Sequence, residues 1–510
     1  MHAKIHSATT IGITAHFVDV EVDLAFGFIS FCIVGLPDKA IKESKDRMRA
    51  AFKNSGLRLP EKLITVNLAP ASLKKEDILF DVPIAVAIMQ AGGLVNLSAD
   101  FINESLMLGE LSLDGAIRPV RGVLSIVHTA MLAGKKRVII PIDNAREASL
   151  VKGIDVIGVR SLTELVAYLR DELTIEPTPS SFDSMVQATQ HVTDFNQVKG
   201  QGLAKRALQI AAAGRHNILL IGSPGSGKTM LARRLSTILP SMSFDEIMQT
   251  TKIYSIAGLL DSTSLIIERP FRPPHHTISQ AGLVGGGSNP RPGEISLANH
   301  GVLFLDELPE FTRTTLEVLR EPLESGSVHI SRASCAVEYP ADFVLVAAMN
   351  PCPCGYFGDR KKQCICTSQQ VAKYLGKISG PLLDRIDLHV HVASINYDEI
   401  KEPAVPGKSS SELFADVMKA IAQQEQRLGT LRNSAMSATQ VEEHCTLTDQ
   451  AEDVLKLAFD KLGLSMRGYH KILKIARTIA DLDGSGTIDR KHVQEAIMYR
   501  SLDKKLTETA

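Results

Sequence analysis

The octapeptide GSPGSGKT, residues 222–229, has the residue types and spacing of a loop that binds phosphate. Its glycines allow the backbone to curl so that successive N–H groups face an anion. The ammonium of Lys228 would reach the β- and γ-phosphates of a nucleotide, and the hydroxyl of Thr229 would bind Mg²⁺. The predicted ATP- and Mg²⁺-binding loop consists of Gly222, Ser223, Pro224, Gly225, Ser226, Gly227, Lys228 and Thr229.

Two adjacent carboxylates follow an apolar run 77 residues beyond Thr229, in the stretch GVLFLDELPEF. Asp306 can hold the water shell of Mg²⁺, and Glu307 can polarise the attacking water. An Asp-Glu pair after an apolar run is, on its own, more often the end of a strand than a site. Its combination with a phosphate-binding loop favours the site.

Three more polar residues complete a predicted catalytic set. Asn350 ends the apolar run FVLVAAM and can orient water near a γ-phosphate. Arg385, in LLDRIDLH, and Arg467, in SMRGYHK, carry planar guanidinium groups suited to stabilising that phosphate, often from a neighbouring subunit. An Arg beside an Asp is usually a solvated ion pair, so the order of these residues after the nucleotide motifs supports the assignment.

Four of the seven cysteines lie in one short stretch, NPCPCGYFGDRKKQCICT. Two C-x-C pairs supply four thiolates, enough for a closed, structural Zn²⁺ site that cross-links a loop too small to have its own core. Reduced thiols, a redox disulfide pair and an iron–sulfur cluster are the alternatives. The basic run 360–362 between the pairs is compatible with DNA contact or with simple solvation. The predicted zinc ligands are Cys352, Cys354, Cys364 and Cys366.

Parallel strands must hold these groups together. Apolar runs precede the phosphate-binding loop (218–221), the two carboxylates (302–305) and Asn350, and a helical pattern follows the loop. In an open α/β sheet, ligands bind at the carboxyl ends of such strands. The middle of the chain is therefore predicted to be an α/β nucleotide-binding core.

Composition limits the remaining choices. The chain has 510 residues, 44% of them hydrophobic and 22% charged, and a net charge of −1, so any nucleic-acid binding needs a local patch or a lined pore. The start of the chain has no apolar signal-like segment, and no apolar run approaches the roughly 18 residues of a membrane span. We therefore expect a cytoplasmic protein without a membrane partner, in which clustered thiols are metal or redox groups rather than structural disulfides.

The chain is predicted to be an α/β multidomain protein. Strand-like runs at 64–68, 136–141 and 155–159 alternate with helical patterns such as 81–95 in the first domain. The last domain has helical spacing almost throughout. The predicted boundaries are a first domain 1–170, a linker 171–195, the nucleotide-binding core 196–400, a second linker 401–411 and a helical domain 412–510.

The run FRPPHHTISQAGLVGGGSNPRPGEISLANHGVLFLDELPEF, with NPCPCG and LLDRIDLH after it, resembles the magnesium-chelatase-like AAA+ ATPases of the YifB/ComM family. The resemblance covers nearly the whole chain. It implies Walker A roles for Lys228 and Thr229, Walker B roles for Asp306 and Glu307, sensor 1 for Asn350, the arginine finger for Arg385 and sensor 2 for Arg467.

The same resemblance implies an ATP-driven homo-hexameric ring. In ComM proteins the implied work is DNA branch migration and helicase activity in natural transformation, with single-stranded or branched DNA in the pore and recombination proteins as further candidate partners. The stretch 250–299 resembles the helix-2 insert, 327–343 the hairpin before sensor 1, and 412–510 the helical lid. Either these segments face the pore or they are surface loops with paired arginines; the candidate phosphate contacts are Arg269, Arg272, Arg291, His329 and Arg332.

The first domain resembles the proteolytic domain of Lon, a ribosomal-protein-S5-domain-2-like fold, in ITVNLAPASLKKEDILFDVPIAVAIM and the segment 108–141. Lon chemistry needs a Ser activated by a Lys. Those positions fall on Asp81 and Leu124, so the resemblance implies a protease-shaped domain without proteolysis. The segment 481–492 imitates a calcium loop but has His492 where a bidentate Glu belongs, which favours a turn between helices.

Two other functions remain as alternatives to DNA translocation. The first is a magnesium-chelatase-like or chaperone-type motor that remodels a protein partner. The second is an ATP-dependent protease, which Asp81 and Leu124 disfavour.

Overall fold

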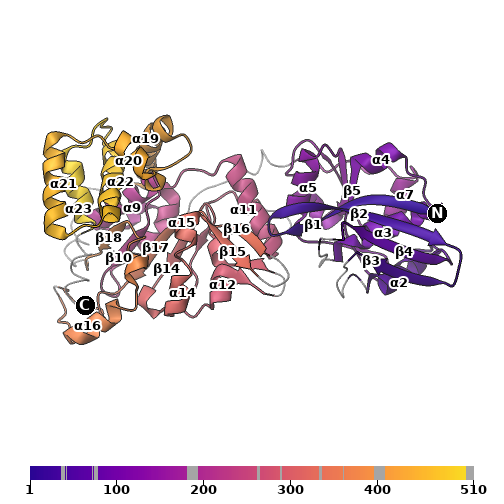
Figure 1. Cartoon of the computed structure of the whole chain (residues 1–510), viewed down its shortest axis with the longest axis horizontal. Helices are drawn as coiled ribbons and strands as arrows, with labels where there is room; N and C mark the ends of the chain where they lie inside the picture. Colours follow the sequence, from indigo (N-terminus) through magenta and orange to yellow (C-terminus); the bar gives the residue numbers. More distant parts are fainter. Residues whose placement is uncertain are drawn as a thin grey trace.

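The computed structural model describes residues 1–35, 41, 43–71, 73, 78–180, 193–260, 265–287, 290–331, 336–359, 361–394 and 408–500. These residues form three parts (Figure 1): an N-terminal α/β part at one end of an elongated molecule, a central α/β core, and a group of C-terminal helices at the other end. No helix within the described ranges has the length and apolar composition that a membrane span requires.

The N-terminal part contains a four-stranded mixed sheet, a three-stranded parallel sheet and a small ribbon. Its strands are β1 (His2–Ile11), β2 (Thr14–Ala25), β3 (Ser30–Val34), β4 (Leu63–Ala69), β5 (Ser105–Met107), β6 (Glu110–Leu111), β7 (Ile117–Arg118), β8 (Arg137–Pro141) and β9 (Asp155–Val159). The first sheet has the order β1-β2-β4-β3 and the second β5-β8-β9. The three strands predicted in this part are confirmed as β4, β8 and β9.

The predicted helix at 81–95 is confirmed as α3 (Asp81–Ala91), which lies against β1 and β2. Every residue of α3 except Gln90 is buried, because almost all its side chains are apolar. The other helices of this part are α2 (Ser44–Asn54), α4 (Ala99–Glu104), α5 (Val123–Leu132), α6 (Ile142–Ala148) and α7 (Leu162–Leu169).

The central core is a five-stranded sheet in which every neighbouring pair is parallel. Its strands are β10 (Ile218–Ile221), β11 (Phe271–Arg272), β14 (Val302–Leu305), β17 (Val344–Met349) and β18 (Leu388–His391), in the order β11-β14-β17-β10-β18. Alternate residues enter different apolar clusters: Leu220 belongs to one and Leu219 to the other. Both faces of the sheet are therefore covered, which explains the uninterrupted apolar runs that predicted β10, β14 and β17.

Helices and short elements surround this sheet. The helices are α9 (Gly202–Gly214), α10 (Lys228–Arg234), α11 (Phe244–Ala257), α12 (Gln280–Val284), α13 (Glu294–Leu297), α14 (Arg313–Glu317), α15 (Pro322–Ser325), α16 (Ser368–Leu375) and α17 (Gly380–Leu383). Two antiparallel ribbons project from the core: β12 (Gly285–Gly286) with β13 (Arg291–Pro292), and β15 (Ser327–Ser331) with β16 (Ala336–Pro340). The hairpin predicted at 327–343 is thus present as β15–β16.

The C-terminal helices cover one face of the core through α9. They are α19 (Ser410–Leu428), α20 (Ala438–His444), α21 (Asp449–Leu462), α22 (Met466–Leu482) and α23 (Arg490–Met498). A capping box formed by Ser409 and Glu412 begins α19. The turn between α22 and α23 lies in the segment that imitates a calcium loop. Its first carboxylate, Asp481, already forms ion pairs with Arg427 and Arg477. The predicted turn between helices is confirmed.

The two predicted linkers meet where they enter the core. Residues 181–192 and 401–407 lie outside the described residues, but the adjoining ends are placed. The backbone N–H of Ser410 donates to the carboxylate of Asp194, and the N–H of Phe195 donates to Ser410 Oγ at 2.9 Å. The start of the helical domain is thereby fastened beside the start of the core.

The N-terminal part contacts the core through α11 and through the tip of the β1–β2 hairpin. Ser255 Oγ on α11 donates to Glu147 Oε1 at 2.5 Å, and Met248 of α11 belongs to the N-terminal apolar cluster. At the hairpin tip, a Cβ atom on Gly12 would lie 2.6 Å from Cγ1 of Val337 on β16. The N-terminal part therefore touches the hairpin that was predicted to face a pore.

Candidate functional site

The ammonium of Lys228 lies inside the loop that precedes α10. Its Nζ donates to the backbone carbonyl oxygens of Gly222 (2.7 Å) and Ser223 (3.1 Å) and to Oδ1 of Asn350 (3.2 Å). Gly227, directly before α10, has φ 90°, a left-handed conformation that favours glycine and that turns the loop into the helix. The predicted lysine and the predicted sensor asparagine are thus neighbours.

Burial lowers the pKa of Lys228, and the negative charges of Asp306 and Glu307 only partly oppose this effect. A half-desolvated ammonium held mainly by carbonyl oxygens lacks a close counter-charge, and a bound polyphosphate would supply one. The electrostatics of the loop therefore favour an anionic ligand.

The candidate Mg²⁺ position lies between Thr229 and Asp306. Thr229 Oγ1 donates to Asp306 Oδ2 at 2.7 Å, so the two oxygen ligands predicted from separate motifs are in contact. Asp306 directly follows β14, and Asn350 directly follows β17, which lies between β14 and β10. Because the three strands are parallel, their carboxyl ends bring the groups to one edge of the sheet.

Glu307 has the left-handed backbone conformation, with φ 53°, which is uncommon for a residue other than glycine and occurs most often at functional sites. Its side chain is 55% exposed, and its Oε2 lies 3.3 Å from Nδ1 of His276. A strained, exposed carboxylate beside the Mg²⁺ position can activate water. The imidazole contact was not predicted, although the HH pair in FRPPHHT was a visible signal for it.

Arg385 and Arg467 lie together in a different place from the phosphate-binding loop. Nη2 of Arg385 lies 2.5 Å and Nη2 of Arg467 3.3 Å from Oε1 of Glu324 on α15. The three side chains line a cavity of about 680 Å³, whose lining residues do not include the phosphate-binding loop. The hydrogen bond from Arg385 lowers the pKa of Glu324. Sequence reasoning missed Glu324, because nothing in its local sequence marks it.

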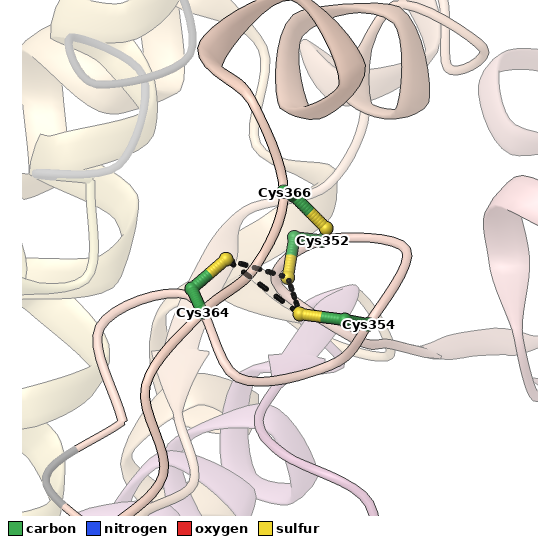
Figure 2. Close-up of side chains that lie close together, drawn as sticks. All are labelled: Cys352, Cys354, Cys364 and Cys366. Atoms are coloured by element: carbon green, nitrogen blue, oxygen red, sulfur yellow. Dashed lines mark hydrogen bonds between the residues drawn. The ribbon is translucent and has the colours of Figure 1, made fainter.

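The four cysteines of the loop after β17 converge (Figure 2). Cys352 Sγ lies 3.3 Å from Cys354 Sγ and 3.6 Å from Cys364 Sγ, and Cys354 Sγ lies 3.6 Å from Cys364 Sγ. Cys366 completes a set whose sulfur atoms all lie within 4.8 Å of one another. These separations exceed the roughly 2.05 Å of a disulfide bond, and the thiols are free.

This cluster fits a tetrahedral Zn²⁺ site. Zn–S bonds of about 2.3 Å place tetrahedral sulfur atoms about 3.8 Å apart, close to the observed separations. The backbone N–H of Phe357 donates to Cys352 Sγ at 3.3 Å, and backbone N–H groups of Ile365 and Tyr356 lower the pKa of Cys354 to about 6. A backbone N–H from Cys366 lowers the pKa of Cys364, but desolvation and hydrogen bonds to Cys354 and Cys352 outweigh it and raise that pKa to about 12. The charge of a bound metal would therefore be needed to ionise this thiol. In the closed set of four sulfur ligands the metal would have a structural role.

The candidate phosphate contacts of the insert are not equivalent. Arg269 is bound to Glu246, with Nη2 3.0 Å from Oε2, and Arg272 forms two hydrogen bonds to Glu294. For these two the alternative of paired arginines is correct, because both cations are already neutralised within the chain. Arg291 and His329 are exposed, and Arg332 and Arg360 lie outside the described residues.

The positions predicted for a Lon-type nucleophile and its activating lysine hold no such pair. Asp81 is completely buried, accepts from Nε of Arg47 at 2.8 Å and is further bonded by Ser44. Leu124 is a buried apolar residue on α5. A carboxylate in a buried ion pair and an aliphatic side chain provide no nucleophile at these positions.

A parallel sheet whose strand ends gather a glycine-rich loop, a Thr–Asp pair and an asparagine has the arrangement typical of P-loop nucleotide-binding proteins. Three family models match successive parts of the chain: "Subunit ChlI of Mg-chelatase" over residues 20–144, "Magnesium chelatase, subunit ChlI" over 194–400, and the ChlI C-terminal model over 407–500.

Relatives that match over nearly their full length identify the family within this class. The chain is 42% identical to the uncharacterized protein YifB of Escherichia coli over 98% of this chain and 97% of that protein. It is 41% identical to the competence protein ComM of Haemophilus influenzae over 99% and 98%. The magnesium-chelatase 38 kDa subunit of Rhodobacter capsulatus is 25% identical over 60% of this chain and 86% of its own length. The chain belongs to the YifB/ComM family of magnesium-chelatase-like AAA+ proteins.

Proposed function

We propose that this protein is an ATPase that works as a homo-hexameric ring and translocates on DNA, promoting branch migration or strand separation. The observation that carries the proposal is the division of the predicted catalytic set between two separate sites. Lys228, Thr229, Asp306 and Asn350 are in contact, whereas Arg385 and Arg467 meet at Glu324 in another cavity. Transferring a phosphoryl group requires positive charge at its outer oxygens.

A neighbouring copy can supply that charge. If the cavity of one subunit covers the phosphate-binding loop of the next, Arg385 approaches the γ-phosphate. Its guanidinium then leaves Glu324 and binds the phosphate instead. Each nucleotide then lies between two subunits, and hydrolysis moves one relative to the other. A closed ring satisfies every such head-to-tail contact.

Support for DNA as the substrate comes from the competence protein ComM, which is 41% identical, and from the exposed Arg291 and His329 on the two ribbons. A remodelling motor for a protein partner is the competing function, and the magnesium-chelatase subunit among the relatives favours it. Both functions use the same ATPase site, so only the substrate distinguishes them.

The test measures ATP turnover with no addition, with single-stranded DNA, with a branched DNA junction and with an unfolded protein. We expect both DNAs to raise turnover and the junction to be resolved only when ATP is hydrolysed, with the Lys228→Ala variant inactive throughout. Stimulation by unfolded protein alone would replace DNA translocation by protein remodelling.

A further inference from the structure

The four-cysteine loop lies directly against the phosphate-binding loop. Ser223 Oγ donates to Oδ2 of Asp359 at 2.8 Å. The other oxygen of Asp359 accepts from the backbone N–H groups of Lys361 (2.7 Å) and Lys362 (3.1 Å). Asp359 is therefore held by its own loop, between the two cysteine pairs, while it binds the loop that would hold ATP.

A backbone contact accompanies this hydrogen bond. Gly355, next to Cys354, has φ 86°, and a Cβ atom there would lie 2.6 Å from Cδ and 2.8 Å from Cγ of Pro224. The absence of a side chain at Gly355 lets the backbone after the first cysteine pair touch the ring of Pro224. The two loops are in contact at two successive residues of the phosphate-binding loop.

A third connection runs through the strand. Asn350, which accepts from Lys228 at 3.2 Å, lies two residues before Cys352. A shift of the first cysteine pair would move this carboxamide as well. The cysteine loop thus contacts the nucleotide site through Asn350, Pro224 and Ser223.

Two large apolar side chains of the cysteine loop contribute little packing to keep it in place. Phe357 is 51% exposed and Ile365 is 86% exposed. A loop without a core needs a cross-link. A metal bound by the four convergent thiols would form one. The shape of the surface that meets the phosphate-binding loop then depends on that metal.

We propose that Zn²⁺ held by Cys352, Cys354, Cys364 and Cys366 makes this loop a support for the phosphate-binding loop, with Asp359 as the positioning residue, so that zinc occupancy sets the affinity for ATP. This inference rests on the proposed function in taking ATP as the ligand. Zinc takes no part in the phosphoryl chemistry, and Asp359 acts only through Ser223.

The first experiment uses the full chain and changes Asp359 without touching a cysteine. Asp359→Ala removes the acceptor of Ser223, and the loss of one such hydrogen bond should weaken ATP binding roughly fivefold in calorimetry with Mg²⁺ present. Asp359→Asn keeps one oxygen that accepts from the backbone N–H groups of Lys361 and Lys362, and its amide can donate to Ser223 Oγ, so it should restore most of the affinity. Gln363→Ala, an exposed change in the same loop, is the matched control and should bind as the wild type does.

The second experiment changes the metal. Wild-type protein should contain one zinc per chain by atomic emission. Removal of zinc with 1,10-phenanthroline, followed by dialysis into Mg²⁺ buffer, or the Cys364→Ser/Cys366→Ser double change, should weaken ATP binding at least about tenfold. Far-UV circular dichroism checks that each sample remains folded, and added Zn²⁺ should restore binding only to the stripped wild type.

The outcomes separate this inference from the proposed function. Wild-type protein that contains zinc but binds no ATP would contradict both. Zinc-free wild type as purified, or ATP affinity unchanged by zinc removal and by Asp359→Ala, would overturn the inference and leave the ATPase proposal standing. If the cysteine variant does not fold, the two Asp359 variants and the zinc-stripped wild type still test the inference.

Discussion

The buried ammonium of Lys228 requires an anionic ligand to balance its charge. Its ammonium is buried, its pKa is lowered by that burial, and its hydrogen bonds go to neutral oxygen atoms of Gly222, Ser223 and Asn350. This arrangement costs desolvation energy and gains little charge compensation until an anion arrives. The lysine is therefore poised for binding rather than for stability.

Replacing Lys228 by Ala should weaken ATP binding severely while leaving the protein folded. The lost charge-assisted hydrogen bonds to phosphate are worth on the order of a hundredfold in affinity. Calorimetry with ATP and Mg²⁺ measures this directly. Lys377→Ala, which removes an exposed cation paired with Glu310, is the matched control and should bind normally; equal binding by both variants would exclude Lys228 from the site.

Glu307 has a different role from the lysine, so its replacement should have a different signature. Glu307→Gln removes the base but keeps the shape, so ATP binding should persist while turnover falls by ~10²–10⁴-fold. Single-turnover hydrolysis and nucleotide binding are measured on the same sample. Glu310→Gln, which changes an exposed carboxylate three residues further on, is the control. Normal hydrolysis by Glu307→Gln would show that another group activates the water.

Among the elements, the contact between β18 and α22 attaches the helical domain to the core. Asp387, directly before β18, has Oδ1 2.8 Å from Nζ of Lys471 on α22 and Oδ2 3.2 Å from Nδ1 of His216. Burial disfavours the charged carboxylate, but Lys471 and His216 outweigh it and hold the pKa of Asp387 far below its usual value. The Asp387–Lys471 ion pair therefore stabilises the docking of the C-terminal helices on the core.

This stabilisation has a defined pH dependence. An Asp in the unfolded chain titrates near pH ~3.9, and the folded pKa is lower, so the contribution is complete above that value and is lost as pH falls below it. Asp387→Asn should lower the free energy of unfolding by about 3 kcal/mol at pH 7, and the difference from wild type should shrink below about pH 4. Urea titrations at several pH values measure it.

The control for that prediction is Asp384→Asn, an exposed carboxylate three residues earlier. This change should alter the free energy of unfolding little at pH 7 and little below pH 4. The free energies of unfolding of wild type and Asp387→Asn could instead differ by the same amount from pH 7 to below pH 4. That result would mean that the charge of Asp387 does not stabilise the C-terminal helices.

In the molecule as a whole, the two halves of the proposed active site belong to different surfaces of one chain. The guanidinium groups of Arg385 and Arg467 are held by Glu324, and Lys228 is held by its own loop. Each chain thus offers one phosphate-binding half and one arginine half. In the proposed ring, assembly with a second copy joins them.

Subunit mixing tests this arrangement. Arg385→Ala should reduce ATP turnover roughly a thousandfold without abolishing ATP binding, because the arginine acts on the transition state. Mixing the Arg385→Ala and Lys228→Ala variants should restore part of the activity, since an intact loop on the first can meet an intact arginine on the second.

Mixing Lys228→Ala with a Lys228→Ala/Arg385→Ala double variant is the matched control and should restore nothing. Sedimentation with ATP reports whether rings form in each mixture. An inactive mixture of well-formed rings would place the arginine in the same subunit as the lysine it serves.

Local patterns predicted much of this protein. The buried strands appeared as uninterrupted apolar runs, the phosphate-binding loop as closely spaced glycines before Lys228, and the candidate metal ligands as two C-x-C pairs. Each of these signals lies within a few residues of chain, where backbone geometry and turn chemistry decide the structure.

Other features depend on contacts between residues far apart in the chain. Glu324 meets Arg467 across 143 residues, and Ser223 meets Asp359 across 136. The sequence left open whether Arg269 and Arg272 contact phosphate or form ion pairs, and the fold brings Glu246 and Glu294 against them. The nearest partner of a long polar side chain is set by how helices and strands pack, and one-dimensional spacing does not contain that information.

The sequence by itself therefore determined the chemistry that is available: a phosphate-binding lysine, paired carboxylates, two candidate arginines and four thiols. The tertiary structure alone decided their grouping, with the cysteine loop placed against the phosphate-binding loop and the arginines placed apart from it. The physical reason is that residue type fixes what a group can do, whereas burial, register and packing fix what it can reach.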